Sequence, residues 1–377
     1  MHICPSGFSD GLTYQENLLA LQNKLDGHDV CVVASTDVIN SQSKLVRGAP
    51  GSFKTHDGIP LLRLPYCPYL PHALNRKLRM LHGLGTHLES WKPDVILLHG
   101  AQCWASLTIR SYCKANPSTR CYADFHSDSH NSATTWMSKR ILHGALYRWI
   151  IHRTADTVSA YLCISIEVMD FVEKYYGIPR ERLEFYPLGG VVYSNEEFQA
   201  LRKRGRERLG LSESSVCLFQ SGKFDRKKKL SQTIRAMKSC NGSPIQLVIA
   251  GAITEDVREE ITTLIAETPA VRFIGWLDAT SLAELLCASD AYVQPGSQSA
   301  TMQLAICARC PVILDDTPSH KPFVNGNGWL VRTETDLVNV IGQIRSDPNV
   351  LTKMSEQSMK IAHELLDYRS LAARLYN

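Results

Sequence analysis

The chain has 377 residues, of which 44% are apolar and 21% charged, and it carries a formal net charge of +4. This composition is typical of a soluble globular protein with room for two domains. The nearly balanced charge argues against a dedicated nucleic-acid-binding protein, which needs a strongly basic surface. No signal peptide and no apolar run of about 18 residues is recognisable, so we expect a cytoplasmic protein.

The first half of the chain alternates between strand and helix patterns. Apolar runs predict strands at residues 1–4, 29–34, 94–98, 120–123 and 161–164. Helical spacing of apolar residues predicts helices at 13–25, 73–90, 103–115, 133–154 and 165–176. This alternation predicts an α/β domain with a parallel sheet that helices cover on both faces.

The pattern breaks at residues 188–212 and then begins again. Further strands are predicted at 216–219, 247–249, 272–274, 291–293 and 312–314, and the residues after 333 are predicted to be helical. We therefore expect a first domain of residues 1–195, a second of 196–360, and a C-terminal helix of 361–377 that packs back on the first. Parallel sheets bind ligands at the carboxyl ends of their strands, so two Rossmann-like domains facing each other across a cleft would suit a reaction between two substrates.

The twelve cysteines are predicted to be reduced core residues. Several lie inside apolar runs, where a thiol behaves as a small hydrophobic side chain. Cys307 and Cys310 have C-x-x-C spacing, but no second pair accompanies them. We therefore favour packing over metal or redox use at this pair.

One segment of the second domain predicts a phosphate site. After the strand at 291–294 the chain reads Pro-Gly-Ser-Gln-Ser-Ala-Thr-Met-Gln, a turn of small residues that leads into a helix pattern. Unpaired backbone N–H groups and the helix dipole make such a helix start attractive to an anion. The hydroxyl groups of Ser297, Ser299 and Thr301 add further donors.

Further motifs follow one another in an informative order. They are Gly11-Leu-Thr-Tyr-Gln-Glu-Asn17, Gly27-His-Asp-Val-Cys-Val-Val33, Ser221-Gly-Lys-Phe-Asp-Arg-Lys-Lys-Lys229, Phe273-Ile-Gly-Trp276, Ser289-Asp-Ala-Tyr-Val293, the 295–313 segment and Asn325-Gly-Asn-Gly-Trp-Leu-Val331. In this order and spacing they resemble the GT-B glycosyltransferases, and above all the large retaining family 4. The resemblance covers nearly the whole chain. It implies a GT-B fold whose first domain binds the acceptor and whose second domain binds a nucleotide-diphosphate sugar.

The resemblance also implies roles for single residues. Lys223 and Lys228 are expected to stabilise the departing diphosphate, and His126 to orient the donor sugar. A register shifted by one would put Lys227 or Lys229 in the place of Lys228, and a solvated basic turn is the other interpretation. The expected donor-binding residues are Gly11, Gly222, Gln298, Ser299, Ala300, Thr301, Met302 and Gln303.

The segment 124–130, Asp-Phe-His-Ser-Asp-Ser-His, follows a predicted strand and should present polar side chains at its end. Asp128 and His130 are acceptor-side candidates beside His126. The same three residues could instead form a structural polar turn or a metal site, which would need further ligands that the sequence does not supply. We therefore expect no metal and no cofactor, with the nucleotide-diphosphate sugar as co-substrate.

The clearest departure from the family is a missing pair of glutamates, which family 4 usually carries in the segment matching 295–313. No glutamate occurs between Glu284 and Glu334, and the second family position falls on Leu304 when counted back from Pro311. In the family this second glutamate holds the nucleotide ribose, so we expect atypical donor recognition. Two alternatives stay open: a catalytically inactive subunit that partners another transferase, and a GT-B-like sugar-nucleotide epimerase or hydrolase.

Residues 58–88 and 129–155 contain no acidic side chain but several basic ones. They form either solvated helix faces or a surface for an anionic membrane, since arginines and Trp149 stand together in 137–153. The expected function is retaining transfer of a hexose from a nucleotide-diphosphate sugar to a saccharide acceptor. We expect a lipid-linked acceptor in bacterial O-antigen or capsule synthesis, and a protein that is cytoplasmic or peripheral on the inner face of the plasma membrane.

Overall fold

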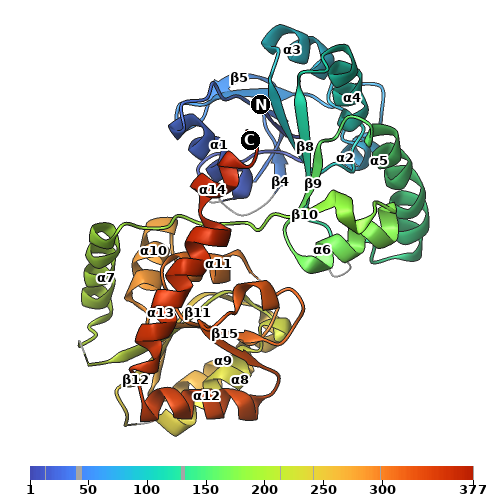
Figure 1. Ribbon diagram of the computed structural model, residues 1–377. Coiled ribbons are helices and arrows are strands. Elements are labelled where there is room, and N and C mark those ends of the chain that lie inside the picture. Colours follow the sequence, from blue (N-terminus) through green and yellow to red (C-terminus); the bar gives the residue numbers. More distant parts are fainter. Residues whose placement is uncertain are drawn as a thin grey trace. The chain divides into compact units, whose positions relative to one another are not determined.

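A computed structural model describes the chain except for residues 13, 40–44, 129–131, 213, 241, 298 and 377. The chain divides into two compact units, one of residues 1–187 with 371–377 and the other of residues 188–370 (Figure 1). The boundary expected after residue 195 falls inside the second unit. Of the expected returning segment 361–377, residues 371–377 belong to the first unit and 361–370 to the second.

The first domain is built on a sheet of mostly parallel strands. They are β1 (His2–Cys4), β2 (Val32–Ser35), β5 (Gly51–Lys54), β6 (Pro60–Leu64), β7 (Val95–His99), β8 (Arg120–Phe125), β9 (Ala160–Cys163) and β10 (Leu183–Phe185). Their order is β10-β9-β8-β7-β1-β2-β6-β5, and the edge pair β5–β6 is antiparallel. A separate antiparallel pair joins β3 (Asp37–Ile39) to β4 (Leu45–Arg47). The predicted parallel sheet is thus confirmed, with an antiparallel edge strand that the sequence did not indicate.

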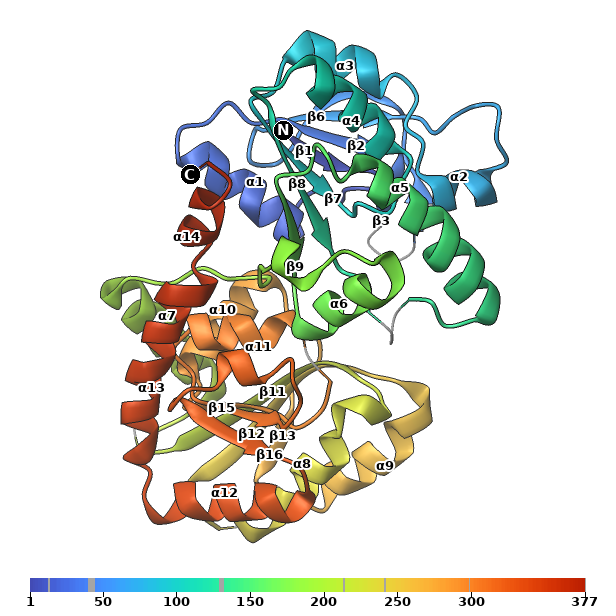
Figure 2. The ribbon, with the colours of Figure 1, turned by 45° about the vertical axis from the view of Figure 1, so that its right-hand side comes forward.

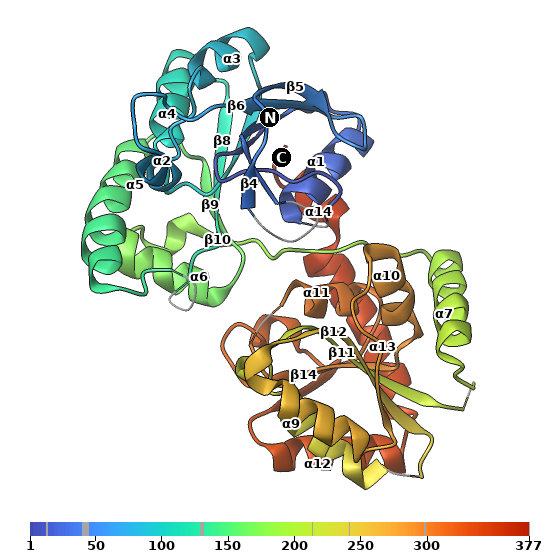
Figure 3. The ribbon, with the colours of Figure 1, turned by 180° about the vertical axis from the view of Figure 1, so that it is seen from behind.

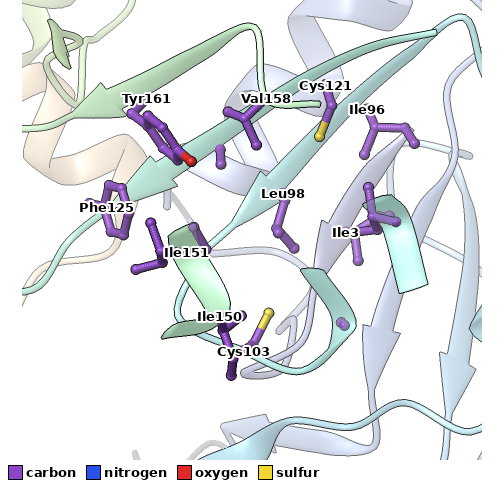
Figure 4. Close-up of a cluster of buried hydrophobic side chains, with 14 of the residues drawn as sticks. Ile3, Ile96, Leu98, Cys103, Cys121, Phe125, Ile150, Ile151, Val158 and Tyr161 are labelled. Atoms are coloured by element: carbon purple, nitrogen blue, oxygen red, sulfur yellow. The ribbon is translucent and has the colours of Figure 1, made fainter. Parts of the chain in front are cut away.

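Helices cover both faces of this sheet (Figure 2). They are α1 (Gln15–Leu25), α2 (His72–Leu78), α3 (Leu84–Trp91), α4 (Ala105–Ala115), the wide π-type helix η1 (Ser138–Tyr147), α5 (Arg148–Thr154), α6 (Ile166–Phe171), the second π-type helix η2 (Val172–Tyr176) and the short turn η3 (Arg180–Arg182). On one face, buried strand residues such as Ile96 and Leu98 pack with Ile150 and Ile151 of α5 (Figure 4). Helix α1 and the C-terminal residues lie on the other face, where the Tyr376 ring packs on His28.

The helix predicted over residues 73–90 is in fact two helices, α2 and α3. Arg79 and Gly83 have φ values of 52° and 83°, which end one helix and begin the next. Between them the backbone pairs with an earlier segment, because Cys67 N–H donates to Met80 O and His82 N–H donates to Pro65 O. Apolar spacing alone does not reveal such a break, since leucines recur at positions 74, 78, 81, 84 and 88 without interruption.

The second domain has a parallel sheet of the order β13-β12-β11-β14-β15-β16. Figure 3 labels its strands β12, β11 and β14. Its strands are β11 (Val216–Phe224), β12 (Ile245–Ile253), β13 (Val271–Phe273), β14 (Ala291–Gln294), β15 (Val312–Asp315) and β16 (Gly328–Val331). Its helices are α7 (Asn195–Leu209), η4 (Arg226–Lys228), α8 (Leu230–Met237), η5 (Lys238–Cys240), α9 (Glu255–Ala266), α10 (Ala279–Ala288), α11 (Ala300–Cys307), η6 (Lys321–Phe323), α12 (Glu334–Ser346), α13 (Val350–Ile361) and η7 (Ala362–Leu366). A final helix, α14 (Tyr368–Ala373), spans the division between the units.

Helices α8, α9 and α12 pack on one face of this second sheet through residues such as Ile234, Ile261 and Ile341. Helix α11 contacts both α10 and α13, and α10 and α11 also contact the strands. The second domain is therefore also a three-layer α/β unit. No helix in the described part of the chain is both long enough and apolar enough to cross a bilayer.

Candidate active site

The turn between β14 and α11 is fixed by buried polar side chains at the end of β14. Gln294 is 1% exposed; its Nε2 donates to Ser297 O at 2.5 Å and its Oε1 accepts from the Ser299 hydroxyl at 2.6 Å. The Tyr292 hydroxyl also donates to Gln294 Oε1, at 3.1 Å. The sheet edge therefore dictates the shape of the turn.

Helix α11 begins without a side-chain cap. Ser299 is its N-cap residue, but the Ser299 hydroxyl donates to Gln294 and accepts no bond from the first helical turn. Within the described residues, no side chain therefore caps the backbone N–H groups of Ala300, Thr301 and Met302 at the positive end of the helix. Met302 contributes backbone alone, because its side chain is buried in the core. Gln298, the remaining predicted donor ligand of this turn, lies outside the described residues.

Of three neighbouring lysines, Lys228 is the one whose ammonium contacts this turn. Its Nζ donates to Ser297 O at 2.8 Å, and burial lowers the pKa of this ammonium. The backbone joins the same segments, since Ser297 N–H donates to Lys227 O at 3.1 Å. The side chain of Lys227 is exposed, and Lys229 Nζ lies 3.0 Å from Asp315 Oδ1. The register that the sequence favoured thus places a cation beside the predicted phosphate site.

Lys223 and Gly222 lie at the carboxyl end of β11. Lys223 is exposed, and Gly222 has a φ of 141°, which L side chains rarely adopt. Gly222 pairs with Gly251 of β12, where an added Cβ would lie 1.9 Å from the Gly222 carbonyl oxygen. Because the two facing residues are glycines, β11 and β12 can stay paired up to the end of β11, where Lys223 lies.

Gln303 is the predicted donor-binding residue to which the structure gives another role. It is fully buried, and its Oε1 accepts from the backbone N–H of Gly189 at 2.9 Å. Helical rotation turns this fourth residue of α11 inward, away from the first turn. Leu304, at the position of the missing glutamate, is half-buried against the next glycine, Gly190, whose added Cβ would lie 3.1 Å from Leu304 Cδ2. The prediction for Gln303 is corrected: this side chain anchors the connection at 189–190.

In the first domain, Asp124 of β8 contacts polar groups at the ends of β7 and β8. Its Oδ2 accepts from His99 Nδ1 at 2.6 Å, and its Oδ1 accepts from Gly100 N–H at 2.8 Å. His126 is the first residue after β8, with Nε2 3.4 Å from Asp124 Oδ2. Burial raises the pKa of Asp124, but His99 and His126 outweigh it and hold this pKa well below its usual range. Burial has the opposite effect on His126 and lowers its pKa. The nearby Asp124 carboxylate outweighs burial, so the pKa of His126 is raised overall.

The other predicted first-domain residues lie around this group or before α1. Asp128 is half-buried in the loop after His126, while His130 lies outside the described residues. Gly11 lies in the segment before the first helix, because α1 begins at Gln15. With a φ of 74° and no atom within 4 Å of an added Cβ, Gly11 needs glycine for its backbone conformation.

The predicted trio of residues 126, 128 and 130 is not the set that gathers here. In the described part of the chain, potential ligand atoms of His99, Asp124 and His126 lie within 4.8 Å of one another. Both ring nitrogens of His99 are already engaged, however, Nδ1 by Asp124 and Nε2 by His2 at 3.1 Å. We therefore interpret the group as a hydrogen-bond network.

Sequence reasoning missed the residues that hold the two sites in place. Tyr292 and Gln294 lie within an apolar run predicted to be a strand, and His99 directly follows the strand predicted at 94–98. A signal was available, because Gln294, His99 and Asp124 are polar residues at or near the carboxyl ends of parallel strands.

Two family models together match most of the chain. The model of the glycosyl transferase 4-like domain matches residues 12–189, and that of the glycosyl transferases group 1 matches residues 202–361. The chain belongs to the GT-B glycosyltransferases. Membership of retaining family 4, as the sequence motifs indicated, is consistent with both matches. No curated protein matches the chain.

Solved structures with the same fold cover essentially the whole GT-B chain. HepE of Anabaena in complex with UDP is 15% identical, with a TM-score of 0.70 over 100% of this chain and 98% of its own. Sucrose-phosphate synthase of Thermosynechococcus elongatus is also 15% identical, with a TM-score of 0.68 over 100% and 96%. WaaG, a glycosyltransferase involved in lipopolysaccharide biosynthesis, is 15% identical, with a TM-score of 0.61 over 99% and 97%. At such identities the likeness establishes the fold.

Proposed function

We propose that this GT-B protein is a retaining hexosyltransferase that uses a nucleotide-diphosphate sugar and a lipid-linked saccharide acceptor of a bacterial surface polysaccharide. The observation that carries the proposal is the Lys228 ammonium on Ser297 O, beside the uncapped start of α11. A cation beside a helix start that no described side chain caps, at a parallel-sheet edge, suits a diphosphate. HepE has been solved with UDP and with UDP-glucose, so UDP is the first nucleotide to test.

In the proposed reaction, the bond between the sugar C1 and the diphosphate oxygen breaks while the acceptor oxygen bonds to C1 on the same face. The acceptor proton passes to the departing diphosphate, so no protein nucleophile is needed. Lys223, Lys228 and the first turn of α11 stabilise the negative charge that grows on the leaving group. His126 orients the donor sugar. Fixed cations thus take the part that a divalent metal plays in metal-dependent transferases.

Thermal unfolding of the purified chain with UDP, GDP, ADP and CMP tests the nucleotide part of the proposal. A ligand at 100 times its Kd stabilises the native state by about 2.7 kcal/mol, so one nucleotide should raise Tm and the others should not. A transfer assay with the matching sugar conjugate then distinguishes the alternatives, because an epimerase would convert the donor without an acceptor. No shift with any of the nucleotides would contradict the proposal and favour the inactive partner subunit.

The lipid-linked acceptor is supported by an aromatic and basic surface on the first domain. We define it by Trp136, Met137, Arg140, Ile141 and Trp149, which are all exposed on or next to η1 and α5; Trp136 is 70% and Trp149 50% exposed. Between residues 129 and 155 the chain contains no acidic side chain. Aromatic and aliphatic groups set among arginines suit the interface of an anionic membrane.

Sedimentation with vesicles tests this surface. We expect binding to vesicles that contain phosphatidylglycerol, weaker binding to phosphatidylcholine vesicles, and a decrease as salt is raised. The double variant Trp136→Ser, Ile141→Ser should lose most of this binding. Trp276→Ser is the matched control, because Trp276 is 76% exposed on the second domain. Equal binding of both variants, or equal binding to both kinds of vesicle, would refute the membrane surface.

A further inference from the structure

A line of polar side chains crosses the α1-covered face of the first sheet. It runs from Asn23 of α1 through His2 of β1 and His99 of β7 to Asp124 of β8. The three contacts are 2.8 Å from Asn23 Nδ2 to His2 Nε2, 3.1 Å from His2 Nδ1 to His99 Nε2, and 2.6 Å from His99 Nδ1 to Asp124 Oδ2. The strands concerned are neighbours in the sheet, in the order β8-β7-β1. The proposed function uses His126 at one end of this line but does not account for the rest.

The hydrogen bonds in the line fix the tautomer of each imidazole. The Asn23 amide donates to His2 Nε2, so the proton of neutral His2 is on Nδ1 and is donated to His99 Nε2. His99 then carries its own proton on Nδ1 and donates it to Asp124. Burial, followed by the neighbouring His99, holds the pKa of His2 well below its usual value, which keeps His2 neutral. Every proton of the line is therefore directed toward Asp124.

The line ends on a buried carboxylate that faces a more exposed imidazole. Asp124 side-chain atoms are 3% exposed and those of His126 are 39% exposed. His99 and Gly100 already donate to Asp124, so the carboxylate is held in one orientation when His126 Nε2 approaches it. The orientation of Asp124 thus determines that Nδ1 lies on the opposite side of the His126 ring.

Other titratable groups of the described residues also act on this pair. Glu16 of α1 adds to the attraction for a protonated His126. The thiols of Cys4 in β1 and Cys163 in β9 also lie near Asp124. Burial raises the pKa of Cys163 to about 12 and holds the pKa of Cys4 well above its usual value, so both thiols stay neutral. Among the described residues, the Asp124 carboxylate thus acts on His126 more strongly than Glu16 does, and Asp124 is itself hydrogen-bonded by His99.

We propose that His99 is a positioning residue for the transfer reaction. His99 acts through Asp124 to fix the ring orientation and the tautomer of His126, while His2 and Asn23 fix the tautomer of His99. The kinetic part rests on the proposed function, whereas the structural part does not. In metal sites, the polar partners that orient a ligating imidazole typically contribute about ten- to hundredfold to affinity or activity, and we expect an effect of similar size for His126.

Nitrogen NMR of the histidine rings in the full, ligand-free chain tests the structural part, with the His126 signals assigned from His126→Gln. We expect a single Nε2–H tautomer for neutral His126 and a pKa above the ordinary value. Asp124→Asn should lower this pKa to or below the ordinary value of a histidine, and His99→Leu should give a mixture of tautomers. His99→Gln, which keeps an N–H toward Asp124, should restore most of the wild-type signal and covers the case in which His99→Leu fails to fold. His82→Gln, an exposed histidine of the same domain, is the control.

The transfer assay supplies the kinetic part. His99→Leu should lower kcat about tenfold or more, shift the acid limb of the pH profile, and leave the donor KM within about threefold, with partial rescue by His99→Gln. An unchanged His126 tautomer and pKa in folded His99→Leu would overturn the inference even if transfer activity is found. If no nucleotide sugar is used, the proposed function fails, while the NMR result still decides the role of His99.

Discussion

Replacing Lys228 by methionine tests the donor site most directly. Methionine keeps most of the length of the side chain and removes the ammonium that donates to Ser297 O at 2.8 Å. Lys227→Met is the matched control. The Lys227 side chain is exposed, and only the backbone carbonyl of Lys227 contacts the same turn. The two variants change the net charge equally.

The expected loss follows from Coulomb's law. One ammonium and one phosphate charge at about 4 Å attract by about 4 kcal/mol at an effective dielectric constant of about 20. Lys228 is half-buried, so solvent and salt screen part of this attraction, and we expect about 2 kcal/mol to remain, or a roughly thirtyfold rise in the Kd for UDP. The lost hydrogen bond to Ser297 O should reduce the free energy of unfolding by about 1 kcal/mol, so the variant stays folded.

Isothermal titration of UDP into wild type, Lys228→Met and Lys227→Met measures this difference. Lys227→Met should change Kd less than threefold. Raising the salt concentration should weaken UDP binding to wild type more than to Lys228→Met, since the variant has lost one of the cations. If wild type and both variants bind UDP with the same affinity, the assignment of Lys228 to the diphosphate is refuted.

Three further changes have outcomes that differ in kind. Gly251→Ala should reduce the urea-unfolding free energy by more than about 3 kcal/mol, because its Cβ would lie 1.9 Å from a backbone oxygen of β11, whereas Gly210→Ala, with open space around it, should cost only about 1 kcal/mol; similar losses would contradict the steric argument. Gln303→Leu should cost about 1–3 kcal/mol, because it leaves the buried N–H of Gly189 without its acceptor, and should leave the Kd for UDP unchanged; a weaker Kd at unchanged stability would return Gln303 to the donor site. Burial and then Arg79 lower the pKa of His143 to about 4, so the unfolded chain takes up this proton first and stability should fall as pH drops from 6.5 to 4. His143→Gln should flatten that part of the Tm-against-pH curve, and an unchanged slope would show that other groups cause it.

Much of the fold followed from periodicity alone. Runs such as 94–98, 120–123 and 291–293 became β7, β8 and β14 because strands buried in a parallel sheet need apolar side chains on both faces. The prediction of a single helix over 73–90 was wrong, because the break between α2 and α3 depends on backbone hydrogen bonds to residues 65–67. These residues lie outside the predicted helix, so its apolar spacing does not reveal the break.

The amino-acid sequence by itself determined the family, the two α/β domains, the turn at 295–299 and the basic run beside it. These depend on residue order and local spacing, which the chain carries without folding. Only the tertiary structure decided that Lys228 contacts the turn, that Gln303 faces inward to Gly189, and that His99 and Asp124 stand behind His126. Such assignments depend on which side chains from separate strands and helices come within about 3 Å of one another, and hydrogen bonds form only at such distances.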